Sequence, residues 1–207
     1  MDTFSIVFVC TGNRFRSPLA EAFVRRLTVG LPVTTQSFGT LELEGAPALP
    51  EALEIAVWCG VDLSSHRTRH VAHSSLADVD LLLGFEEAHV RRAVVDAQAP
   101  RQRAFTLRGV VRLLAAAEIP PHDNVVARAR HVVDQLDGIR ATEPESRRRD
   151  DMPDPFGRSW NVYRDTAAEV RELSILLVAT LFGTTDTRGL PPVATRRDRG
   201  LRSLWRR

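Results

Sequence analysis

The sequence predicts an α/β fold with a mostly parallel sheet covered by helices on both faces. Short apolar runs alternate along the chain with helical patterns, which is the order that produces parallel strands. A length of 207 residues suits one domain of this type. Apolar residues make up 43% of the chain and charged residues 26%, which is the composition of a protein with a hydrophobic core.

Four apolar runs are expected to form the strands. Each is rich in β-branched, aromatic or leucine residues and is bounded by polar or turn-forming residues. The expected strands are residues 4–9, 33–38, 79–84 and 103–107. The first run is almost entirely apolar, which predicts a strand that is buried on both faces in the centre of the sheet.

Helical patterns follow the strands. The first helix is expected to begin with Ser17 as its N-cap and Pro18 at its first position, and to run to about Leu27. Gly60 and Gly183 mark the ends of two later helices, because glycine commonly follows a helix. The helices expected after the first are residues 50–59, 86–96, 108–118 and 161–182.

Two segments depart from this alternation. Residues 119–150 contain a helical pattern over 122–136 and are expected to form an insertion. Residues 187–207 carry seven arginines against one aspartate, so the segment 184–207 is expected to be a basic, disordered tail. We expect one domain over residues 1–183, and a solvated tail rather than a nucleic-acid-binding segment.

The composition excludes several function classes. All 28 basic residues are arginine, which excludes lysine-dependent phosphate loops and Schiff-base lysines. The two cysteines are too few for a disulfide framework or a four-cysteine zinc site. The longest apolar stretch, residues 173–182, is shorter than the about 18 residues that a membrane span needs. We therefore expect a cytoplasmic protein with no membrane span.

Cys10 lies where the first expected strand ends and a loop leads into a helix. Ligands collect at the carboxyl ends of the strands in open parallel sheets. A loop that turns into a helix N-terminus directs backbone N–H groups inward and adds the positive end of the helix dipole, so it can bind a dianion such as phosphate. The same field favours the thiolate form of Cys10. The sequence thus predicts a phosphate site with a cysteine nucleophile.

Arg16 is expected to complete this site. Its planar guanidinium can bind two phosphoryl oxygens, and this interaction strengthens as the phosphoryl group becomes trigonal bipyramidal. Gly12 and Asn13 tolerate the positive φ values that a tight loop requires. The spacing from Cys10 to Arg16 is a weak signal in an arginine-rich chain, so the prediction rests on the strand, loop and helix together.

Four segments resemble the low molecular weight protein tyrosine phosphatase family, and the likeness extends over most of residues 4–183. They are VCTGNRFRSP at 9–18, SFGT at 37–40, VDLSSHRTR at 61–69 and PDPFG at 153–157. The resemblance implies a three-layer α/β fold with a four-stranded parallel sheet. It implies a phosphate-binding loop made of Thr11, Gly12, Asn13, Arg14, Phe15, Arg16 and Ser17. It also implies a supporting network of Asn13, Ser17, Ser37 and His66, with the Ser17 hydroxyl steadying the Cys10 thiolate.

Asp154 is the candidate general acid, in the segment that resembles the acid loop of the family. A proton delivered to the bridging oxygen helps a tyrosine phenolate to leave, because the conjugate acid has a pKa of about 10. Prolines on both sides restrict the backbone of Asp154. Cys10, Arg16 and Asp154 are then the catalytic residues of a phosphatase for phosphorylated proteins or small aryl phosphates. Water hydrolyses its phosphocysteine intermediate, with Asp154 as the base.

The chain departs from the pattern of this family at several places. Phe15 stands where many members have a second cysteine, so a disulfide that would protect the nucleophile cannot form there. Cys59, at the end of an expected helix, is expected to be a small buried hydrophobe. Phe and Gly at 156–157 replace a frequent pair of tyrosines, and residues 41–43 offer no aromatic side chain.

Two other functions stay open at this point. An arsenate reductase could use the same loop, because arsenate mimics phosphate. With Cys59 as the only further cysteine, it would need an external thiol. The third candidate is a non-catalytic phosphate-binding module, in which the presence of Cys10, Arg16 and Asp154 together would be a coincidence.

Three histidines are candidates for a zinc site. His66, His70 and His73 have spacings of four and three, which would align them on one face of a helix. The segment is polar and arginine-rich, and no glutamate follows any of these histidines in the pattern of a zinc protease. His66 is also already assigned to the loop network. No metal and no cofactor are therefore expected, and the sequence leaves the oligomeric state open.

Overall fold

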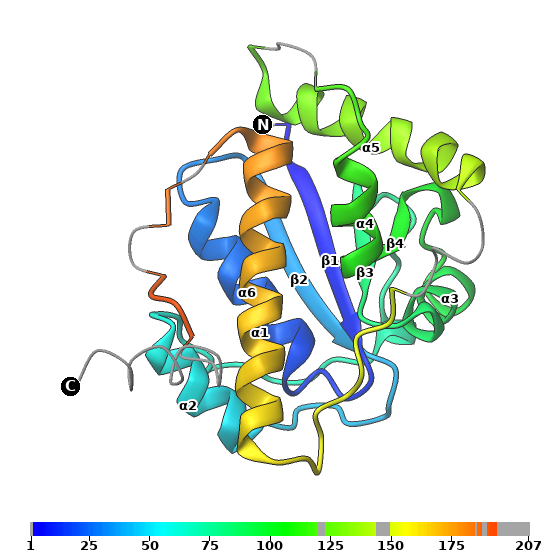
Figure 1. Cartoon of the computed structure of the whole chain (residues 1–207). Helices are drawn as coiled ribbons and strands as arrows, with labels where there is room; N and C mark the ends of the chain where they lie inside the picture. Colours follow the sequence, from blue (N-terminus) through cyan, green and yellow to red (C-terminus); the bar gives the residue numbers. More distant parts are fainter. Residues whose placement is uncertain (1, 120–122, 144–149, 185, 188–189, 194–207) are drawn as a thin grey trace, which may run out of the picture.

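The chain forms a four-stranded parallel sheet between two layers of helices, as described by a computed structural model (Figure 1). The description covers residues 2–119, 123–143, 150–184, 186–187 and 190–193. The strands are β1 (Phe4–Cys10), β2 (Val33–Gly39), β3 (Leu81–Gly84) and β4 (Ala104–Thr106). They lie in the order β2-β1-β3-β4, and every pair is parallel. The expected fold class is confirmed.

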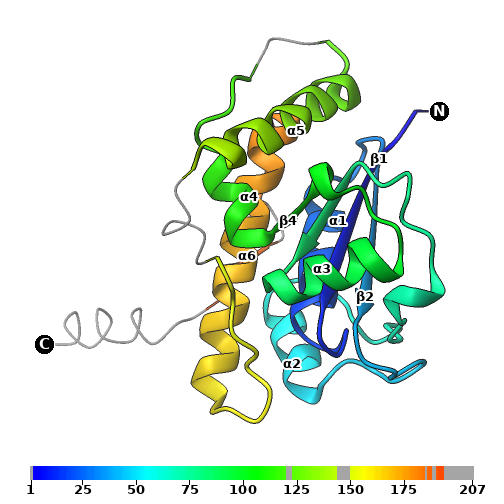
Figure 2. The same cartoon turned by 90° about the vertical axis from the view of Figure 1, so that its right-hand side faces the viewer.

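Helices pack on both faces of this sheet. They are α1 (Arg16–Leu27), α2 (Pro50–Trp58), α3 (Glu87–Asp96), α4 (Leu107–Leu114), α5 (Val125–Thr142) and α6 (Trp160–Phe182). Helix α3 covers one face, while α1, α4, α5 and α6 contribute to the core on the other. In Figure 1 the long helix α6 crosses in front of the sheet, and Figure 2 shows α4, α5 and α6 together on one side of it.

The two faces of β1 contribute to two separate hydrophobic cores. Ile6 and Phe8 belong to the core that includes α1 and α6. Val7 and Val9 belong to the core that includes α3. Because successive side chains of a strand point to opposite faces, a strand that is buried on both sides appears in the sequence as a continuous apolar run. This explains why β1 could be predicted as a central strand.

The order of the strands places the end of β1 at a switch in the chain topology. Helix α1 leads from β1 to β2 on one side, while β3 pairs with β1 on the other. Such switch points open a crevice outside the carboxyl ends of the strands. Cys10, the last residue of β1, pairs with Gly39 of β2 and therefore lies at this crevice.

The first helix begins differently from the expectation. Helix α1 begins at Arg16, and its N-cap is Phe15, which makes no side-chain capping bond. Ser17 lies inside the first turn, so its assignment as the N-cap was wrong. The hydroxyl of Ser17 bonds to Cys10 and Asn13 of the preceding loop instead.

Helix α5 is part of the main core, whereas the sequence predicted an insertion over residues 119–150. The helix spans Val125–Thr142, longer and later than the expected 122–136. Its buried residues are Val126, Ala129, Val132, Val133 and Leu136. They recur with helical spacing and pack in the same core as α4 and α6. Residues 120–122 and 144–149 of this segment lie outside the described residues.

Part of the expected tail also packs on the domain. Leu190 and Val193 are 2% and 5% exposed and join the main core. Arg171 of α6 donates a hydrogen bond to the Leu190 carbonyl. For these residues the expectation of a disordered tail over 184–207 was wrong. The seven arginines that made this segment basic lie outside the described residues.

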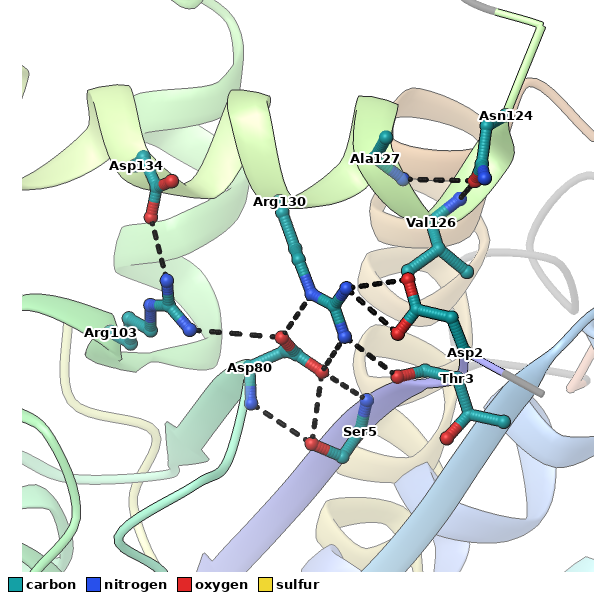
Figure 3. Close-up of polar contacts among 10 residues, drawn as sticks. All are labelled: Asp2, Thr3, Ser5, Asp80, Arg103, Asn124, Val126, Ala127, Arg130 and Asp134. Carbon is teal, nitrogen blue, oxygen red and sulfur yellow. Dashed lines mark hydrogen bonds and ion pairs between the residues drawn. The ribbon is translucent and has the colours of Figure 1, made fainter.

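A polar network centred on Asp80 connects α5 to the sheet (Figure 3). The Asp80 carboxylate accepts hydrogen bonds from Ser5 N at 2.9 Å and from Arg130 Nε at 2.7 Å. Arg130 also binds the Asp2 carboxylate at 2.8 Å and the Thr3 carbonyl at 3.0 Å. Burial acts to raise the pKa of Asp80, but the Arg130 and Ser5 hydrogen bonds outweigh it and hold this pKa below its ordinary value.

Asp80→Asn should lower the free energy of unfolding by about 2 kcal/mol at pH 7, because Arg130 loses a buried, charged acceptor. The folded-state pKa of Asp80 lies below its unfolded value of about 3.9. Its contribution is therefore complete above about pH 4 and is lost as the pH falls through the folded-state pKa. Urea denaturation of wild type and variant at several pH values should show a difference that shrinks below about pH 4.

Asp134→Asn is the matched control. Asp134 is on the same helix as Arg130, its side chain is 57% exposed, and it pairs with Arg103. The change should alter the free energy of unfolding by less than about 0.5 kcal/mol, because exposed ion pairs contribute little. If both variants lost the same free energy of unfolding, the burial of Asp80 would not contribute to stability.

Candidate active site

The segment from Cys10 to Arg16 forms a loop that leads from β1 into α1. The chain after β2 supports it, because Thr40 N donates to the carbonyls of Cys10 and Thr11 at 3.1 and 2.9 Å. Leu41 N donates to the same Thr11 carbonyl at 3.0 Å. The backbone N–H groups of residues 12–15 take part in none of the hydrogen bonds found among the described residues. These donors remain available to an anion bound in the loop.

Asn13 lies at the centre of the bonds that shape this loop. Its backbone has φ of 51°, in the left-handed region that asparagine tolerates better than most residues. Its side-chain Nδ2 donates to Ser17 Oγ and to Ser37 Oγ, each at 2.9 Å. Its Oδ1 accepts from Arg69 N at 3.0 Å, and its carbonyl contacts His66 Nε2 at 2.7 Å. Every polar group of the Asn13 side chain is therefore used to hold one conformation.

His66 is a donor in this network. Burial lowers the pKa of His66 below its ordinary value and outweighs the opposite effect of the bond to Asn13. The ring is then neutral at pH 7, and because its partner is a carbonyl oxygen, Nε2 carries the proton. The four residues that the resemblance implied as a supporting network are thus in contact through Asn13. The structure adds Glu21, which accepts from Ser37 Oγ at 2.6 Å.

The backbone is crowded at Gly39 but not at Gly12. A Cβ on Gly39 would lie 3.1 Å from Asn13 N and Cβ, so glycine allows the loop to approach β2 closely. A Cβ on Gly12 would meet Leu43 Cδ1 at 3.7 Å, which is an ordinary contact, and Gly12 does not have a positive φ. The expectation that both Gly12 and Asn13 supply positive φ values is confirmed for Asn13 and wrong for Gly12.

The Cys10 thiol lies beneath the loop and is bound by a hydroxyl. Its side chain is 2% exposed, and Sγ lies 3.0 Å from Ser17 Oγ. Because Ser17 Oγ accepts from Asn13 Nδ2, its own proton is directed either to Cys10 Sγ or to the Phe38 carbonyl at 3.3 Å. The Asn13–Ser17 pair can therefore stabilise a thiolate at Cys10.

Arg16 is a buried cation held by several groups. Its residue exposure is 1%. Nη1 donates to the Glu86 carboxylate at 2.6 Å and to the Met152 carbonyl at 2.8 Å. Nη2 donates to Thr11 Oγ1 at 3.1 Å and to the Asp154 carboxylate. One edge of the guanidinium is thus committed to protein groups, and Nη2 is shared between two residues of the pocket.

Thr11 receives two hydrogen bonds at its hydroxyl oxygen. One comes from Arg16 Nη2, and the other involves His89 Nε2 at 3.0 Å. Burial, together with the nearby Arg16 charge, lowers the pKa of His89 to about 4, so its ring is neutral. His89 Nδ1 accepts from Glu86 N at 3.0 Å, which places the ring proton on Nε2. With both acceptor positions filled, the Thr11 hydroxyl proton is free to donate to a ligand.

Asp154 reaches the loop from the segment before α6. Its Oδ2 binds Arg16, and its Oδ1 accepts from Phe156 N at 3.0 Å, which forms a tight turn. Gly157 N in the same turn donates to the Tyr163 hydroxyl of α6 at 3.3 Å. Tyr163 in turn packs edge-on against Phe15, with ring centroids 5.0 Å apart. The segment that carries Asp154 and the loop after Cys10 are therefore joined through one aromatic contact.

A single pocket joins these groups. Its polar end is formed by Cys10, Thr11, Gly12, Arg16 and Asp154, and its walls by Arg14, Phe15, Leu41, Leu43, Leu49 and Phe156. Of the predicted phosphate-binding residues, only Asn13 and Ser17 do not line it, because they support the loop from behind. Phe156 is 68% exposed at the pocket edge, whereas Leu41 and Leu43 provide aliphatic walls.

The sequence interpretation did not identify Glu86 and His89. Both follow β3, and Glu86 is the N-cap of α3. They meet Arg16 and Thr11 because β3 lies beside β1 in the sheet. A signal was present, since polar residues directly after a buried parallel strand are placed at the same edge as Cys10. The sequence alone does not show that β3 lies beside β1, and this strand order is what brings Glu86 and His89 to Arg16 and Thr11.

The second cysteine behaves as expected from its position. Cys59 follows α2, is fully buried and carries a free thiol. Burial raises the pKa of Cys59 to about 11, so the thiol stays protonated at neutral pH. Phe15, at the position where the sequence comparison expected a second cysteine in many family members, is 3% exposed and packs in the main core.

The three histidines weighed as zinc ligands do not lie on one helix. His66 belongs to the Asn13 network, while His70 precedes a short 3₁₀ helix, Val71–His73. Among the described residues, no helix is long and apolar enough to cross a membrane.

Comparison with known sequences gives a consistent match. The family model "Low molecular weight phosphotyrosine protein phosphatase" matches residues 5–138. The probable low molecular weight protein-tyrosine-phosphatase EpsP of Ralstonia nicotianae is 37% identical over 84 residues, which are 41% of this chain and 57% of that protein. The protein-arginine-phosphatase of Bacillus subtilis is 26% identical over 170 residues, which are 81% of this chain and 90% of the relative.

Solved structures share the fold. The low molecular weight protein tyrosine phosphatase from T. tengcongensis has a TM-score of 0.59 and 25% identity, and the match covers 85% of this chain and 98% of the other. The YwlE arginine phosphatase from Geobacillus stearothermophilus has a TM-score of 0.61 and 25% identity over 86% of this chain and 92% of the other. Because the family model covers more than half of the sequence, the chain belongs to the low molecular weight phosphotyrosine protein phosphatase family.

Proposed function

We propose that this member of the family hydrolyses phosphotyrosine in proteins or peptides, through a phosphocysteine intermediate on Cys10. The proposal rests on one observation above all. The Cys10 thiol, the Arg16 guanidinium and the Asp154 carboxylate line the same pocket, although Asp154 is 138 residues away from Arg16 in the chain. A nucleophile, a cation for the phosphoryl oxygens and a proton donor are the groups that two-step phosphoryl transfer requires.

Cys10 is the proposed nucleophile. In the first step its thiolate attacks phosphorus, a sulfur–phosphorus bond forms, and the bond from phosphorus to the phenolic oxygen breaks. The Ser17 hydroxyl, 3.0 Å from Sγ, stabilises the anion before this step and after the intermediate is hydrolysed. In the second step water attacks phosphorus, the sulfur–phosphorus bond breaks, and inorganic phosphate leaves.

Arg16 and Thr11 are proposed to bind the phosphoryl oxygens. Since Arg16 Nη1 is bound by Glu86 and Met152, the nitrogen that can exchange partners is Nη2. A phosphoryl dianion would replace the Asp154 carboxylate at Nη2 and accept the free Thr11 proton. Both interactions strengthen as charge spreads over the equatorial oxygens of the transition state.

Asp154 is the proposed general acid and base. Once released from Arg16, the Asp154 carboxylate would take up a proton from solvent beside the bound dianion, and the resulting carboxyl group can donate this proton to the leaving phenolic oxygen. The turn through Phe156 N and the Gly157–Tyr163 contact hold the segment in place while the partner of the carboxylate changes. The same group, now a carboxylate, accepts a proton from the attacking water. It returns this proton to solvent when phosphate leaves and the carboxylate pairs with Arg16 again.

The walls of the pocket favour an aromatic leaving group. Leu41, Leu43, Leu49 and Phe156 present apolar surface beyond the phosphate end. Arg14 lies on the same lining, and its Nε donates to the Pro47 carbonyl at 2.9 Å. A cation at this position would repel the guanidinium group of a phosphoarginine, so we favour phosphotyrosine over the substrate class of the Bacillus subtilis relative.

The two alternative functions make different demands. An arsenate reductase would need a thiol to resolve the adduct on Cys10, and Cys59 is fully buried and protonated. Such an activity would require an external thiol. A non-catalytic phosphate-binding module would not need Asp154 in contact with Arg16. A cytoplasmic location, expected from the sequence, remains part of the proposal.

A comparison of substrates tests the proposal. Phosphotyrosine, phosphoserine and phosphoarginine peptides, and arsenate with a thiol, are offered to the purified protein in parallel. We expect phosphate release from phosphotyrosine to be fastest and to be abolished by Cys10→Ser. Faster turnover of phosphoarginine would refute the assigned substrate, and arsenate reduction without phosphatase activity would favour the reductase. Turnover that survives Cys10→Ser would remove the nucleophile from the mechanism.

Asp154→Ala should slow the hydrolysis of phenyl phosphate by about 10²–10⁴-fold, because phenolate is a poor leaving group without a proton donor. The rate of p-nitrophenyl phosphate hydrolysis should fall less, because its leaving group is already a weak base. Steady-state kcat for both esters measures the difference. Asp165→Ala, an exposed change on α6, is the control and should alter neither rate. Equal slowing of the two esters would show that Asp154 is not the acid.

Glu86→Gln should lower kcat for p-nitrophenyl phosphate by about tenfold, because Arg16 loses the charge that holds its Nη1 edge. Glutamine keeps an acceptor oxygen for the N-cap of α3, so the melting temperature should change little. Glu87→Gln, at the next and more exposed position, is the matched control. A loss of stability without a change in kcat would assign Glu86 a purely structural role.

A further inference from the structure

A second group of ionisable side chains lies outside the catalytic pocket. It consists of Glu42 and Glu44, in the connection after β2, and His70 and His73, at the ends of a segment that includes the 3₁₀ helix. The ligand atoms of Glu42, His70 and His73 all lie within 4.8 Å of one another. His70 Nδ1 is 3.5 Å from Glu42 Oε1, and His73 Nε2 is 4.0 Å from Glu42 Oε2.

The His70 ring is oriented as metal-binding histidines are. Its side chain is 4% exposed, and Nε2 lies 3.2 Å from the Thr40 carbonyl. Because a carbonyl only accepts, Nε2 carries the proton, and Nδ1, which lies 3.5 Å from Glu42 Oε1, keeps its lone pair. Nδ1 has one long hydrogen bond, 3.3 Å from Ala72 N. A metal-binding histidine commonly donates its other N–H group to a backbone carbonyl in this way.

Glu44 supports the same group of residues. Its Oε2 accepts from His70 N at 2.9 Å and lies 3.7 Å from His73 Nδ1. Two carboxylates therefore face two imidazole rings over a short span of surface. Among the described residues, the side chains of Glu42, His70 and His73 bring their ligand atoms close enough together to hold a metal ion.

We propose that Glu42, His70 and His73 bind a divalent transition-metal ion of the Zn²⁺ class. Two imidazole nitrogens and a carboxylate oxygen are a ligand set that suits Zn²⁺, whereas Mg²⁺ and Ca²⁺ prefer oxygen ligands alone. At metal–ligand bonds of about 2.0–2.1 Å, tetrahedral ligand atoms lie about 3.3 Å apart. The two distances to Glu42 are 3.5 and 4.0 Å, and all three ligand atoms lie within 4.8 Å of one another. The side chains of Glu42 and His73 are 71% and 58% exposed, so they can move closer around an ion.

The position of this site connects it to the pocket wall. Glu42 stands between Leu41 and Leu43, and both leucines line the catalytic pocket. The Thr40 carbonyl that orients His70 belongs to the residue whose N–H supports the Cys10 and Thr11 carbonyls. A bound ion would therefore stabilise the aliphatic wall of the pocket without touching a reacting group. The site is independent of the proposed reaction and can be tested in an inactive protein.

Calorimetric titration of Zn²⁺ into the Cys10→Ser protein tests the site, because this change removes the catalytic thiol as a competing ligand. We expect one equivalent of Zn²⁺ to bind. Glu42→Gln and His73→Ala should each weaken binding at least about tenfold, since even partners outside the first coordination shell contribute that much. Co²⁺ in place of Zn²⁺ should develop visible absorption bands that both changes remove.

The control is His131→Ala, an exposed histidine of α5 far from the cluster in the chain. It should leave Zn²⁺ binding unchanged. Melting curves without metal verify that each variant is folded, which the exposure of Glu42 and His73 leads us to expect. No binding to the Cys10→Ser protein would overturn the proposal. Binding that is equal in Glu42→Gln, His73→Ala and the control would also overturn it, because the ion would then lie elsewhere.

Discussion

The single conformation of Asn13 is the constraint on which the site depends. A left-handed backbone at a non-glycine residue is costly, and it persists here because the side chain and carbonyl of Asn13 bond to Ser17, Ser37, Arg69 and His66. These partners come from α1, β2 and the segment that follows α2. The loop is thus shaped by three separate parts of the chain before any ligand arrives, so anion binding requires little reorganisation.

A buried arginine imposes the second constraint. A guanidinium that is 1% exposed must be paired, and the protein provides two carboxylates, Glu86 and Asp154. The two differ in their surroundings, because Glu86 caps a helix whereas Asp154 belongs to a turn at the pocket edge. The first pair fixes Arg16, and the second can exchange with a phosphoryl dianion of the same charge sign. In the proposed mechanism, substrate binding and the release of the general acid are therefore one event.

The surroundings of the site depart at several positions from the pattern that the family resemblance led us to expect. Phe15 and Tyr163 provide an aromatic contact between loop and acid segment in place of a second cysteine. Leucines rather than aromatic residues form one wall of the pocket, and the connection that carries them also carries Glu42. The proposed ion site thus lies next to residues that line the pocket.

Local patterns in the sequence determined the fold class, the strands, most of the helices and the position of Cys10 at the end of the first strand. Alternating apolar runs and a cysteine at a strand end are visible over a few residues, because backbone geometry imposes those spacings. Tertiary structure alone decided that Ser17 bonds to Cys10 instead of capping α1, that α5 and Leu190 join the core, and that Glu86 reaches Arg16. It also brought His70 and His73 to Glu42 instead of aligning them on a helix. Each of these contacts joins segments distant in the chain or depends on the strand order, and no local spacing records which elements become neighbours in space.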